Sequence, residues 1–545
     1  LRERADELFT ASVSQRGVPK QLLQIVKKTQ RGDSVARGQP QRPSPLLRIR
    51  WRSLMPLEDL CVLRAKDDTL NSKIGDERGA NLFSWNMDMN AFNVPTMRLS
   101  SNAMNIMDEP TVRCIADAGV LVILVVPFDS GASSGTGAGV EAPSATVSSD
   151  VLMDYEISQC WSFMKCAQTL IEGDIAARIM IVLPDELSGS MIVGASRSLS
   201  LEFPELETQR LFLRRDTRLS NTSAPNLIDA VLDSQGSLRS EPDIAIHGNF
   251  VQVRRAFPHR MQRWPSRSVL FDGGASSGSR KLFVVTGGTG GIGTELVNWL
   301  IDVQKVAAQR IVLLSRRASS ASPHPRGCTM IKVDLSHSGA LARCEDLQRV
   351  IQESDGVEGI FQLAGVLADS MMINMTREKL KAVAAPKAAS LLELLGEARR
   401  QRWGAKWALA FSSTTSLLGY PGQSNYAAAN SFLDGLMHVT TSSQDSATLC
   451  GSSYTRLLGG GGNSGDDKGG RAGASSPRIP VIACNWGPWG EVGMAQKGSK
   501  AYDQSLKGGE LPMETKDALD ALESLLRIVR DKVGTAAGNV GVGTL

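Results

Sequence analysis

The sequence lacks the cysteine and histidine spacing of a metal-binding protein. Its eight cysteines are scattered, form no C-x-x-C pair and have no histidine partner at a metal-ligand spacing. The closest two, Cys160 and Cys166, have the spacing of core thiols on one helix. We therefore expect no structural metal and a reducing, cytoplasmic setting.

The sequence also lacks long hydrophobic runs and a dominant charge. The most apolar run, Val120 to Val126, is far short of the roughly 20 residues that cross a bilayer and is typical of a buried parallel strand. The 60 basic and 56 acidic residues leave a formal net charge of +4. Because no basic run is interleaved with aromatic residues, we expect no nucleic-acid partner and no membrane partner.

The length of 545 residues, with 42% hydrophobic residues, favours two domains plus connecting segments. The chain begins at Leu1 rather than Met, so we expect it to be part of a longer polypeptide. Residues 1–45 carry the scattered Pro, Gly and Arg of a linker. Stretches rich in small residues have the composition of exposed loops, at 129–150, 272–279 and 440–477.

The first half, residues 46–258, alternates short strands with a helical segment. Residues 151–171 carry apolar side chains at helical spacing, and strands are indicated at 46–51, 120–126, 179–183 and 210–213. This alternation predicts a parallel sheet covered by helices. Without a glycine fingerprint or a catalytic set, this half is expected to be a structural, cofactor-free domain. A linker at 259–280 would join it to a second domain at 281–545.

The second half opens with a dinucleotide-binding pattern. An apolar strand at 282–286 runs into a glycine turn, and residues 294–303 follow at helical spacing. Such glycines let backbone N–H groups approach a pyrophosphate at a helix N-terminus. The turn reads Gly287-Gly288-Thr289-Gly290-Gly291-Ile292-Gly293.

The residues after the next strand, 310–314, indicate which dinucleotide binds. A NAD site usually has Asp or Glu here, whereas this chain has Ser315, Arg316 and Arg317. Hydroxyl and guanidinium donors suit a 2′-phosphate and therefore NADPH; an ordinary basic strand end is the alternative. Asp334, with Leu335 beside it, follows a further strand and is placed to contact adenine.

The candidate reacting residues include Ser413 and Tyr426. Asn430 lies four positions after Tyr426, on the same helix face. A phenol can donate a proton to the oxygen of a carbonyl under reduction, while a hydroxyl holds that oxygen. A free phenol has a pKa of about 10, so a nearby cation is needed, and Lys387 is the candidate. Taken singly, these residues could equally be a packed aromatic, a loop hydroxyl and a surface charge.

Together these stretches resemble the short-chain dehydrogenase/reductase superfamily, specifically the ketoreductase domain of modular polyketide and fatty-acid synthases. Most of the superfamily has Lys four residues after the Tyr and Asn on the preceding helix. Synthase ketoreductases resemble a swap of the two, and this chain has Asn430 and Lys387 in the swapped places. The resemblance implies that Tyr426 donates the proton, Ser413 orients the ketone, Lys387 assists Tyr426 and Asn430 supports a proton relay. The matching stretches are 286–293, 314–317, 363–369, 385–387, 411–413, 422–430 and 485–489.

The resemblance also assigns cofactor contacts to Ala364, Gly365 and Pro488. Residues 488–495 should lead into a lid over the substrate. Two residues depart from the family, which often has His and Ala where this chain has Gln362 and Leu363.

In such synthases a truncated, cofactor-free Rossmann-like subdomain precedes the catalytic one. The strand at 46–51 is similar to its opening strand, and residues 194–205 are similar to its helix before a late strand.

The resemblance extends to the configuration of the product. Ketoreductases that give the D-alcohol resemble one another in a Leu-Asp-Asp loop and in Pro and Asn shortly before the Tyr. This chain keeps Asp369 in that loop and has Pro421 and Asn425. The opposite class carries Trp eight residues before the Tyr, where this chain has Leu418. These residues favour the D-alcohol; the alternative is that they only shape the loop.

The sequence therefore predicts an α/β protein with two Rossmann-like subdomains, of which the second reduces a 3-ketoacyl thioester with NADPH. The substrate would arrive on the phosphopantetheine arm of an acyl carrier protein, among neighbouring synthase domains. A fatty-acid-synthase-type ketoreductase, a free-standing short-chain dehydrogenase, a non-reducing scaffold or epimerising domain, and a nucleotide-sensing module are the alternatives.

Overall fold

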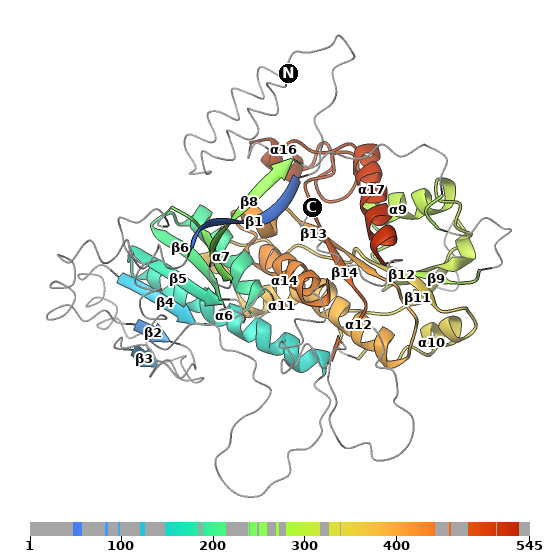
Figure 1. Cartoon of the computed structure of the whole chain (residues 1–545), viewed down its shortest axis with the longest axis horizontal. Helices are drawn as coiled ribbons and strands as arrows, with labels where there is room; N and C mark the ends of the chain where they lie inside the picture. The colour runs from blue at the N-terminus through green and yellow to red at the C-terminus, as the bar shows by residue number, and fades with distance from the viewer. Residues whose placement is uncertain are drawn as a thin grey trace, which may run out of the picture.

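The computed structural model describes helices and strands of both halves of the chain (Figure 1). The predicted linker at 1–45, most of the three stretches rich in small residues, and Arg317 lie outside the described residues. The described residues are 47–56, 82–84, 96–98, 120–125, 148–183, 187, 189–213, 238, 240–247, 250–258, 269–271, 279–316, 326–337, 339–441, 457–458, 478–507 and 510–533.

The first half contains a six-stranded sheet in the order β1-β8-β7-β6-β5-β4. Its strands are β1 (Leu47–Pro56), β4 (Val120–Val125), β5 (Ala177–Leu183), β6 (Leu206–Leu213), β7 (Asp243–His247) and β8 (Phe250–Pro258). Strands β4 to β7 run parallel, as predicted. Strand β8 is antiparallel to both β7 and β1, so the prediction of a purely parallel sheet is wrong at this edge. Only Gly248 and Asn249 separate β7 from β8, and two residues can close a hairpin but not a parallel crossover.

Among the described residues of this half, the helices are α6 (Ser149–Glu172) and α7 (Ser190–Glu202). Helix α6 confirms the helix predicted at 151–171. A separate two-stranded sheet pairs β2 (Leu82–Ser84) with β3 (Thr96–Arg98).

The second half contains a six-stranded sheet in the order β11-β10-β9-β12-β13-β14, with every neighbouring pair parallel. Its strands are β9 (Leu282–Thr286), β10 (Ile311–Ser315), β11 (Thr329–Lys332), β12 (Val357–Gln362), β13 (Ala408–Ser413) and β14 (Val481–Trp486). In sequence order this is the 3-2-1-4-5-6 arrangement of a Rossmann-like, doubly wound sheet. The order reverses between β9 and β12, and ligands of such folds bind at the carboxyl ends of the strands there.

Helices cover both faces of this second sheet. In β9, Leu282 and Val284 face one core, while Phe283 and Val285 face the other, which explains why this strand is apolar throughout. One face carries α9 (Gly291–Asp302) and α17 (Thr515–Val533). The other carries α10 (Glu345–Gln352), α11 (Arg377–Ala384), α12 (Ser390–Arg400) and α14 (Ser424–Thr441). The short elements are η3 (Ala308–Arg310), η4 (Met372–Asn374), the π-helical turn η5 (Ala385–Ala389), α13 (Thr415–Leu418) and α16 (Lys500–Lys507).

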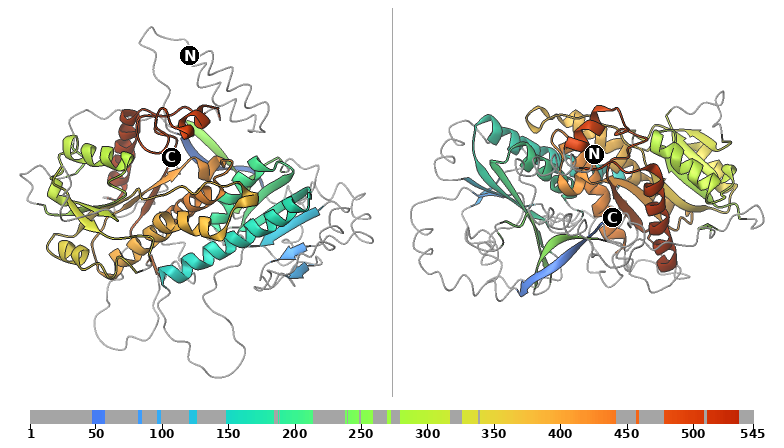
Figure 2. Two further views of the ribbon diagram at one scale, coloured as in Figure 1. Left: turned by 180° about the vertical axis from the view of Figure 1, so that it is seen from behind. Right: turned by 90° about the horizontal axis from the view of Figure 1, so that it is seen from above.

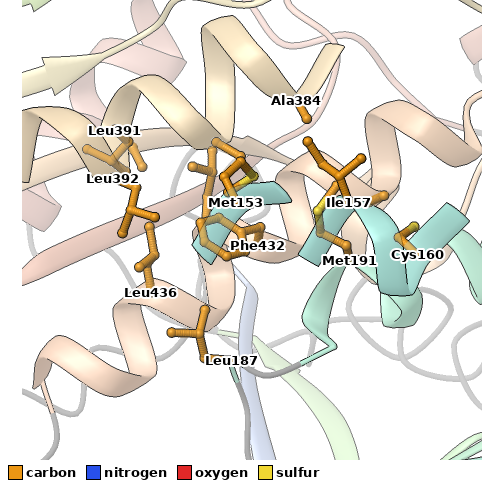
Figure 3. Packing of buried hydrophobic residues seen from close by; sticks show 14 of the residues in the cluster. Met153, Ile157, Cys160, Leu187, Met191, Ala384, Leu391, Leu392, Phe432 and Leu436 are labelled. Atoms are coloured by element: carbon orange, nitrogen blue, oxygen red, sulfur yellow. The ribbon is translucent and has the colours of Figure 1, made fainter. Parts of the chain in front are cut away.

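The two halves share one hydrophobic core, with α6 and α7 packed against helices of the second half (Figures 2 and 3). Met153 and Met191, from α6 and α7, lie with Phe432 of α14 in this cluster. Helices α7 and α14 cross so closely that a Cβ on Gly194 would lie 2.2 Å from the carbonyl oxygen of Ala427. Burying a large apolar side chain contributes about 1.5–3 kcal/mol to the free energy of unfolding. This shared core therefore holds the first half against α14, which carries Tyr426 in its first turn.

Within the part of the chain that the structure describes, no helix is both long enough and apolar enough to span a bilayer. No group of three or more His, Cys, Asp and Glu side chains in the same residues is arranged to hold a metal ion.

Candidate active site

The glycine turn between β9 and α9 forms a tight backbone cradle. Gly287 has a φ of +68°, and a Cβ on it would lie 2.8 Å from the backbone nitrogen of Ala364. A Cβ on Gly293 would lie 2.3 Å from the carbonyl oxygen of Gly287. Helix α9 begins after Gly290, and among the described residues no side chain caps it. The N–H groups of its first turn are therefore available to a pyrophosphate, which fits a dinucleotide.

The residues predicted to hold the adenosine end lie beside this turn. Ser315 ends β10, and its Oγ lies 3.5 Å from Oγ1 of Thr289. Arg316 follows and is exposed. The carboxylate of Asp334 accepts hydrogen bonds from the N–H and the hydroxyl of Ser336, which lowers the pKa of Asp334. Leu335 is buried next to it. Thr289 and Ser315 thus bring two hydroxyls together at the end of β10, and the exposed Arg316 follows Ser315 in the chain.

The end of β12 is tied to the glycine turn. The N–H groups of Leu363 and Ala364 donate to Oγ1 of Thr286, at 3.2 and 3.1 Å. These two hydrogen bonds therefore hold the end of β12, which leads to Gly365, beside the end of β9, which leads into the glycine turn.

Gln362, which the sequence marks only as a departure from the family pattern, is buried and hydrogen-bonds to two separate parts of the site. Its Oε1 accepts from the hydroxyl of Thr286 at 2.5 Å. Its Nε2 lies within donating distance of the carbonyl oxygens of Pro386 (2.9 Å) and Lys387 (3.1 Å) and of the Ser390 hydroxyl (2.6 Å). Gln362 thereby links the glycine-turn strand to the π-helical turn η5 that carries Lys387.

Lys387 and Tyr426 come together although 39 positions separate them (426 − 387). Lys387 is only 3% exposed, and its Nζ donates to the carbonyl oxygen of Phe411 at 2.9 Å. The same Nζ lies 5.0 Å from the ring centroid of Tyr426. A Cβ on Gly365 would be 3.6 Å from this Nζ, so Gly365 leaves room for the ammonium.

Ser413 and Asn430 complete the predicted reacting set. Ser413 is the last residue of β13, and its Oγ accepts from the N–H of Thr415 at 3.2 Å. Asn430 is buried, and its Nδ2 donates to the carbonyl oxygen of Tyr426 at 2.8 Å. Its Oδ1 has no hydrogen-bond partner among the described residues. The structure thus places all four residues on β13, η5 and the start of α14.

The predicted stereocontrol residues divide into a buried and an exposed group. Asn425 is buried, and its Nδ2 donates to the carbonyl oxygen of Ala368 at 2.8 Å. Asp369 accepts from Nε2 of Gln423 at 3.1 Å. Pro421 is exposed, and Leu418 is 45% exposed. The loop containing Asp369 is therefore bonded directly to the residues around Tyr426.

The segment after β14 reaches the glycine turn. Pro488 follows the strand, and its carbonyl oxygen accepts from the N–H of Met513. Further along, Gly493 approaches α9 so closely that a Cβ on Gly291 would lie 2.7 Å from the Gly493 nitrogen. A Cβ on Gly493 would lie 3.1 Å from the Ile292 side chain. Residues 488–493 therefore run across the start of α9.

A polar network under Ser413 was missed by the sequence reasoning. Asp434 accepts from the Ser416 hydroxyl (2.6 Å) and from Nδ2 of Asn485 (2.8 and 3.0 Å), and burial raises the pKa of its carboxyl. The Ser416 hydroxyl also lies 2.8 Å from the carbonyl oxygen of Ser413. The only sequence signal for Asp434 was its spacing. Asp434 lies eight positions after Tyr426 and four positions after Asn430, so the three residues share one helix face.

Comparison with known proteins finds similar sequences over the second half and beyond. The family model described as "KR domain" matches residues 282–452. One protein of the phenolphthiocerol/phthiocerol polyketide synthase of Mycobacterium tuberculosis is 28% identical over 428 residues, which cover 76% of this chain and 20% of that protein. The 6-methylsalicylic acid synthase of Penicillium terrestre is 25% identical over 323 residues, covering 55% of this chain and 17% of that protein. The chain thus spans about a fifth of the length of these curated relatives.

Solved structures agree in fold. The solved structure of an A1-type ketoreductase matches with a TM-score of 0.58 at 19% identity, covering 91% of this chain and 96% of the other. The structures of A-type ketoreductases from a modular polyketide synthase match with a TM-score of 0.56 at 19% identity, covering 89% and 91%. With the glycine turn and the Lys387–Tyr426 pair in place, residues 282–452 match the ketoreductase-domain family model, and the chain has the fold of ketoreductases from modular polyketide synthases.

Proposed function

We propose that this chain reduces a carrier-bound 3-ketoacyl thioester to the 3-hydroxyacyl thioester with NADPH. The observation that carries the proposal is the buried ammonium of Lys387, 5.0 Å from the ring centroid of Tyr426. Strand β12, which leads to Gly365 beside this ammonium, is hydrogen-bonded to the strand that opens the glycine turn. A phenol, a cation and a nucleotide cradle in one place suit carbonyl reduction better than any other chemistry of these residues.

NADPH, when bound, supplies the hydride that reaches the ketone carbon. In our proposal the hydroxyl of Ser413 donates a hydrogen bond to the ketone oxygen and fixes its direction. The phenol Oη of Tyr426 then gives its proton to that oxygen as the C–H bond forms, so that the ketone becomes an alcohol. Lys387, held by the carbonyl of Phe411, would place its ammonium against the ring of Tyr426 and stabilise the negative charge that develops on the phenol oxygen during the transfer.

Asn430 is proposed to return a proton to the tyrosine. Its Nδ2 is fixed on the carbonyl of Tyr426, while its Oδ1 has no hydrogen-bond partner in the described part of the chain. A buried acceptor of this kind is usually satisfied by water. A water held there would connect the site to solvent and return a proton to the oxygen of Tyr426 between turnovers.

The choice of NADPH over NADH rests on the end of β10. We infer that a ribose 2′-phosphate would be bound by Thr289, Ser315 and the exposed Arg316, because they offer only donors and no carboxylate directly follows β10 to repel it. Arg317 would add a second guanidinium to this group.

The substrate is proposed to arrive on the phosphopantetheine arm of an acyl carrier protein. The chain spans about a fifth of relatives that are polyketide synthases, so further synthase domains would flank it in a longer, cytoplasmic polypeptide. We divide the chain into a linker at 1–45, a structural subdomain at 46–258, a linker at 259–280 and a catalytic subdomain at 281–545. Asp369, Pro421 and Asn425 favour the D-alcohol, and Leu418 stands where the opposite class has Trp.

The test is the absorbance of NADPH in the presence of a simple 3-ketoacyl thioester, with NADH as the control. Oxidation of NADPH that is much faster than oxidation of NADH, with the D-3-hydroxyacyl thioester as product, is the expected result. NADPH binding without turnover would instead favour a non-reducing scaffold or an epimerising domain. A comparison of acyl chain lengths and α-substituents would separate polyketide from fatty-acid substrates.

A further inference from the structure

Two loops, one of which lies close to Tyr426 in the chain, are hydrogen-bonded to each other. The first, the Asp369 loop, comprises residues 366–376 and includes η4; the second, the Pro421 turn, comprises residues 419–423. The N–H of Ser370 donates to the carbonyl oxygen of Gly422 at 2.7 Å. Nε2 of Gln423 donates to Asp369 at 3.1 Å. Because Tyr426 lies three residues after the Pro421 turn, a change in the distance between the two loops would alter the surroundings of its phenol.

One carboxylate from the first half of the chain binds both loops. Glu202 accepts a hydrogen bond from the N–H of Gly422 through Oε1, at 2.8 Å. It accepts another from the N–H of Met372 through Oε2, at 2.6 Å. Each oxygen therefore holds one loop, and hydrogen bonds to a charged acceptor are the strong ones.

The place of Glu202 is not explained by the stability of its own helix. Glu202 is the last residue of α7, where the helix dipole disfavours negative charge. Burial raises the pKa of its carboxyl, while the two backbone N–H groups act in the opposite direction. The helix dipole and burial both disfavour the charged form of the Glu202 carboxyl. Each of its oxygens nevertheless accepts a hydrogen bond from one of the two loops.

Other side chains of the first half hold the same loops from neighbouring positions. Gln168 of α6 is buried, and its Nε2 donates to the carbonyl oxygens of Met372 (2.9 Å) and Met375 (2.8 Å). The hydroxyl of Ser198 on α7 accepts from the N–H of Tyr420 at 3.1 Å. The Asp369 loop and the Pro421 turn are thus fixed to α6 and α7 as well as to each other.

We propose that Glu202 is a positioning residue that sets the distance between the Asp369 loop and the Pro421 turn, and so controls how the ketone is presented to Tyr426. The cofactor-free first half thereby contributes to substrate affinity and product configuration without touching the reacting atoms. This inference rests on the proposed ketoreduction for its catalytic readout, and on the loop geometry alone for its structural readout.

The test compares Glu202→Gln with wild type in the full chain. The glutamine keeps the size of the side chain, but its amide NH₂ would face one of the two backbone N–H donors. We expect hydrogen exchange at Met372 and Gly422 to accelerate by about tenfold, the scale of one lost buried hydrogen bond. The KM for the 3-ketoacyl thioester should rise and the ratio of the two alcohol configurations should fall, while NADPH affinity is unchanged. Glu202→Ala, which removes both acceptors, should show larger changes of the same kind.

The matched control is Glu205→Gln, because Glu205 is exposed and lies three residues further along the chain. It should alter neither hydrogen exchange nor product configuration. Unchanged exchange at Met372 and Gly422 in both Glu202 variants would overturn the proposal. So would a drop in melting temperature and NADPH affinity with no change in KM or configuration, because that result indicates a purely structural role. If the wild type reduces no ketone, the proposed function fails, and the exchange data still decide whether Glu202 holds the two loops.

Discussion

Both halves of this chain contain a six-stranded sheet with helices, but they differ in the groups that bond to the N-termini of helices α6, α7 and α9. In the first half, the hydroxyl of Ser148 accepts from the N–H of Val151 and caps α6, and Asp150 adds a negative charge to its first turn. The N–H of Gly189, which precedes α7, donates to the buried carboxylate of Glu156. In the second half, α9 begins after Gly290, and none of the described side chains caps it. A side chain thus caps α6, and the Glu156 carboxylate bonds to the residue before α7, whereas no side chain that the structure describes caps α9 and its first turn is left for a ligand.

This difference shows that a sheet with crossover helices does not by itself make a nucleotide site. The second half combines glycines that allow a close backbone approach with an uncapped helix and a strand order that reverses beside them. In the first half, buried charged groups form ion pairs and hydrogen bonds within the protein. Its Asp243 bonds to Arg197 and Arg210, and Arg197 also donates to the carbonyl oxygen of Ser416, three residues after Ser413. Side chains of the first half also hydrogen-bond to loops of the second.

The largest expected effect on the scaffold comes from Asp243→Asn. Burial by itself would raise the pKa of Asp243, but Arg197, Arg210 and Arg254 hold it far below its usual range. Removing the carboxylate leaves buried arginines without their counter-charge, so we expect a loss of about 3–5 kcal/mol in the free energy of unfolding. Urea unfolding measures this loss, and Asp346→Asn, at an exposed pair with Arg349, should cost far less.

The same variant has a predictable pH dependence. Because the folded pKa of Asp243 is lowered, its stabilising contribution is complete at neutral pH. It is lost as the pH falls below the unfolded value of about 4, where the unfolded chain takes up a proton that the folded chain does not. The stability difference between wild type and Asp243→Asn should therefore shrink in acid. A difference that stays constant down to the acid limit would contradict the assigned ion cluster.

An intermediate effect is expected from Gly290→Asp, which gives α9 the kind of cap that α6 has. Gly290 has φ −83° and ψ 172°, the backbone of an N-cap residue, and its Cβ would approach only the Gly287 oxygen, at 3.3 Å. The new carboxylate would cap the helix and repel the cofactor phosphates. We expect the Kd for NADPH to rise by at least about tenfold, with no loss of melting temperature. Gly290→Ala, which adds no charge, is the control, and equal affinity in the aspartate variant would break the comparison of the two helices.

The smallest effect is expected from Ser148→Ala. It removes the cap of α6 and should cost about 1 kcal/mol of stability or less, since the bond is long and exposed. Cofactor affinity and turnover should remain those of the wild type. Thermal unfolding and NADPH titration check both points, and a change in NADPH affinity would show that α6 is coupled to the site.

Periodicity predicted part of the regular structure. The apolar runs that became β4, β5 and β9, and the helical spacing that became α6 and α9, are signals within single segments. The antiparallel edge at β8 was missed because the short Gly248-Asn249 connection was not used, although such a pair is a hairpin signal. Contacts such as Arg197 with Ser416 connect residues 219 positions apart and leave no local pattern.

The candidate site was predictable where its residues follow motifs. The glycine turn, Ser413, Tyr426 and Asn430 lie at recognisable spacings, and the structure brings Lys387 onto Tyr426. The residues that hold this arrangement were not predictable, because Gln362, Glu202 and Gln168 act through backbone groups that any residue presents. The roles of the reacting residues remain predictions that activity measurements must test.

The most direct test of the account compares Tyr426→Phe with wild type in two assays on the same preparation, NADPH binding and reduction of a 3-ketoacyl thioester. We predict unchanged NADPH affinity and a loss of turnover of at least about 100-fold, the scale of a missing general acid. Tyr426 is only partly buried, so the loss of its hydroxyl should leave the fold intact. Turnover at the wild-type rate in Tyr426→Phe would contradict the placement of the reaction between Ser413, Lys387 and Tyr426.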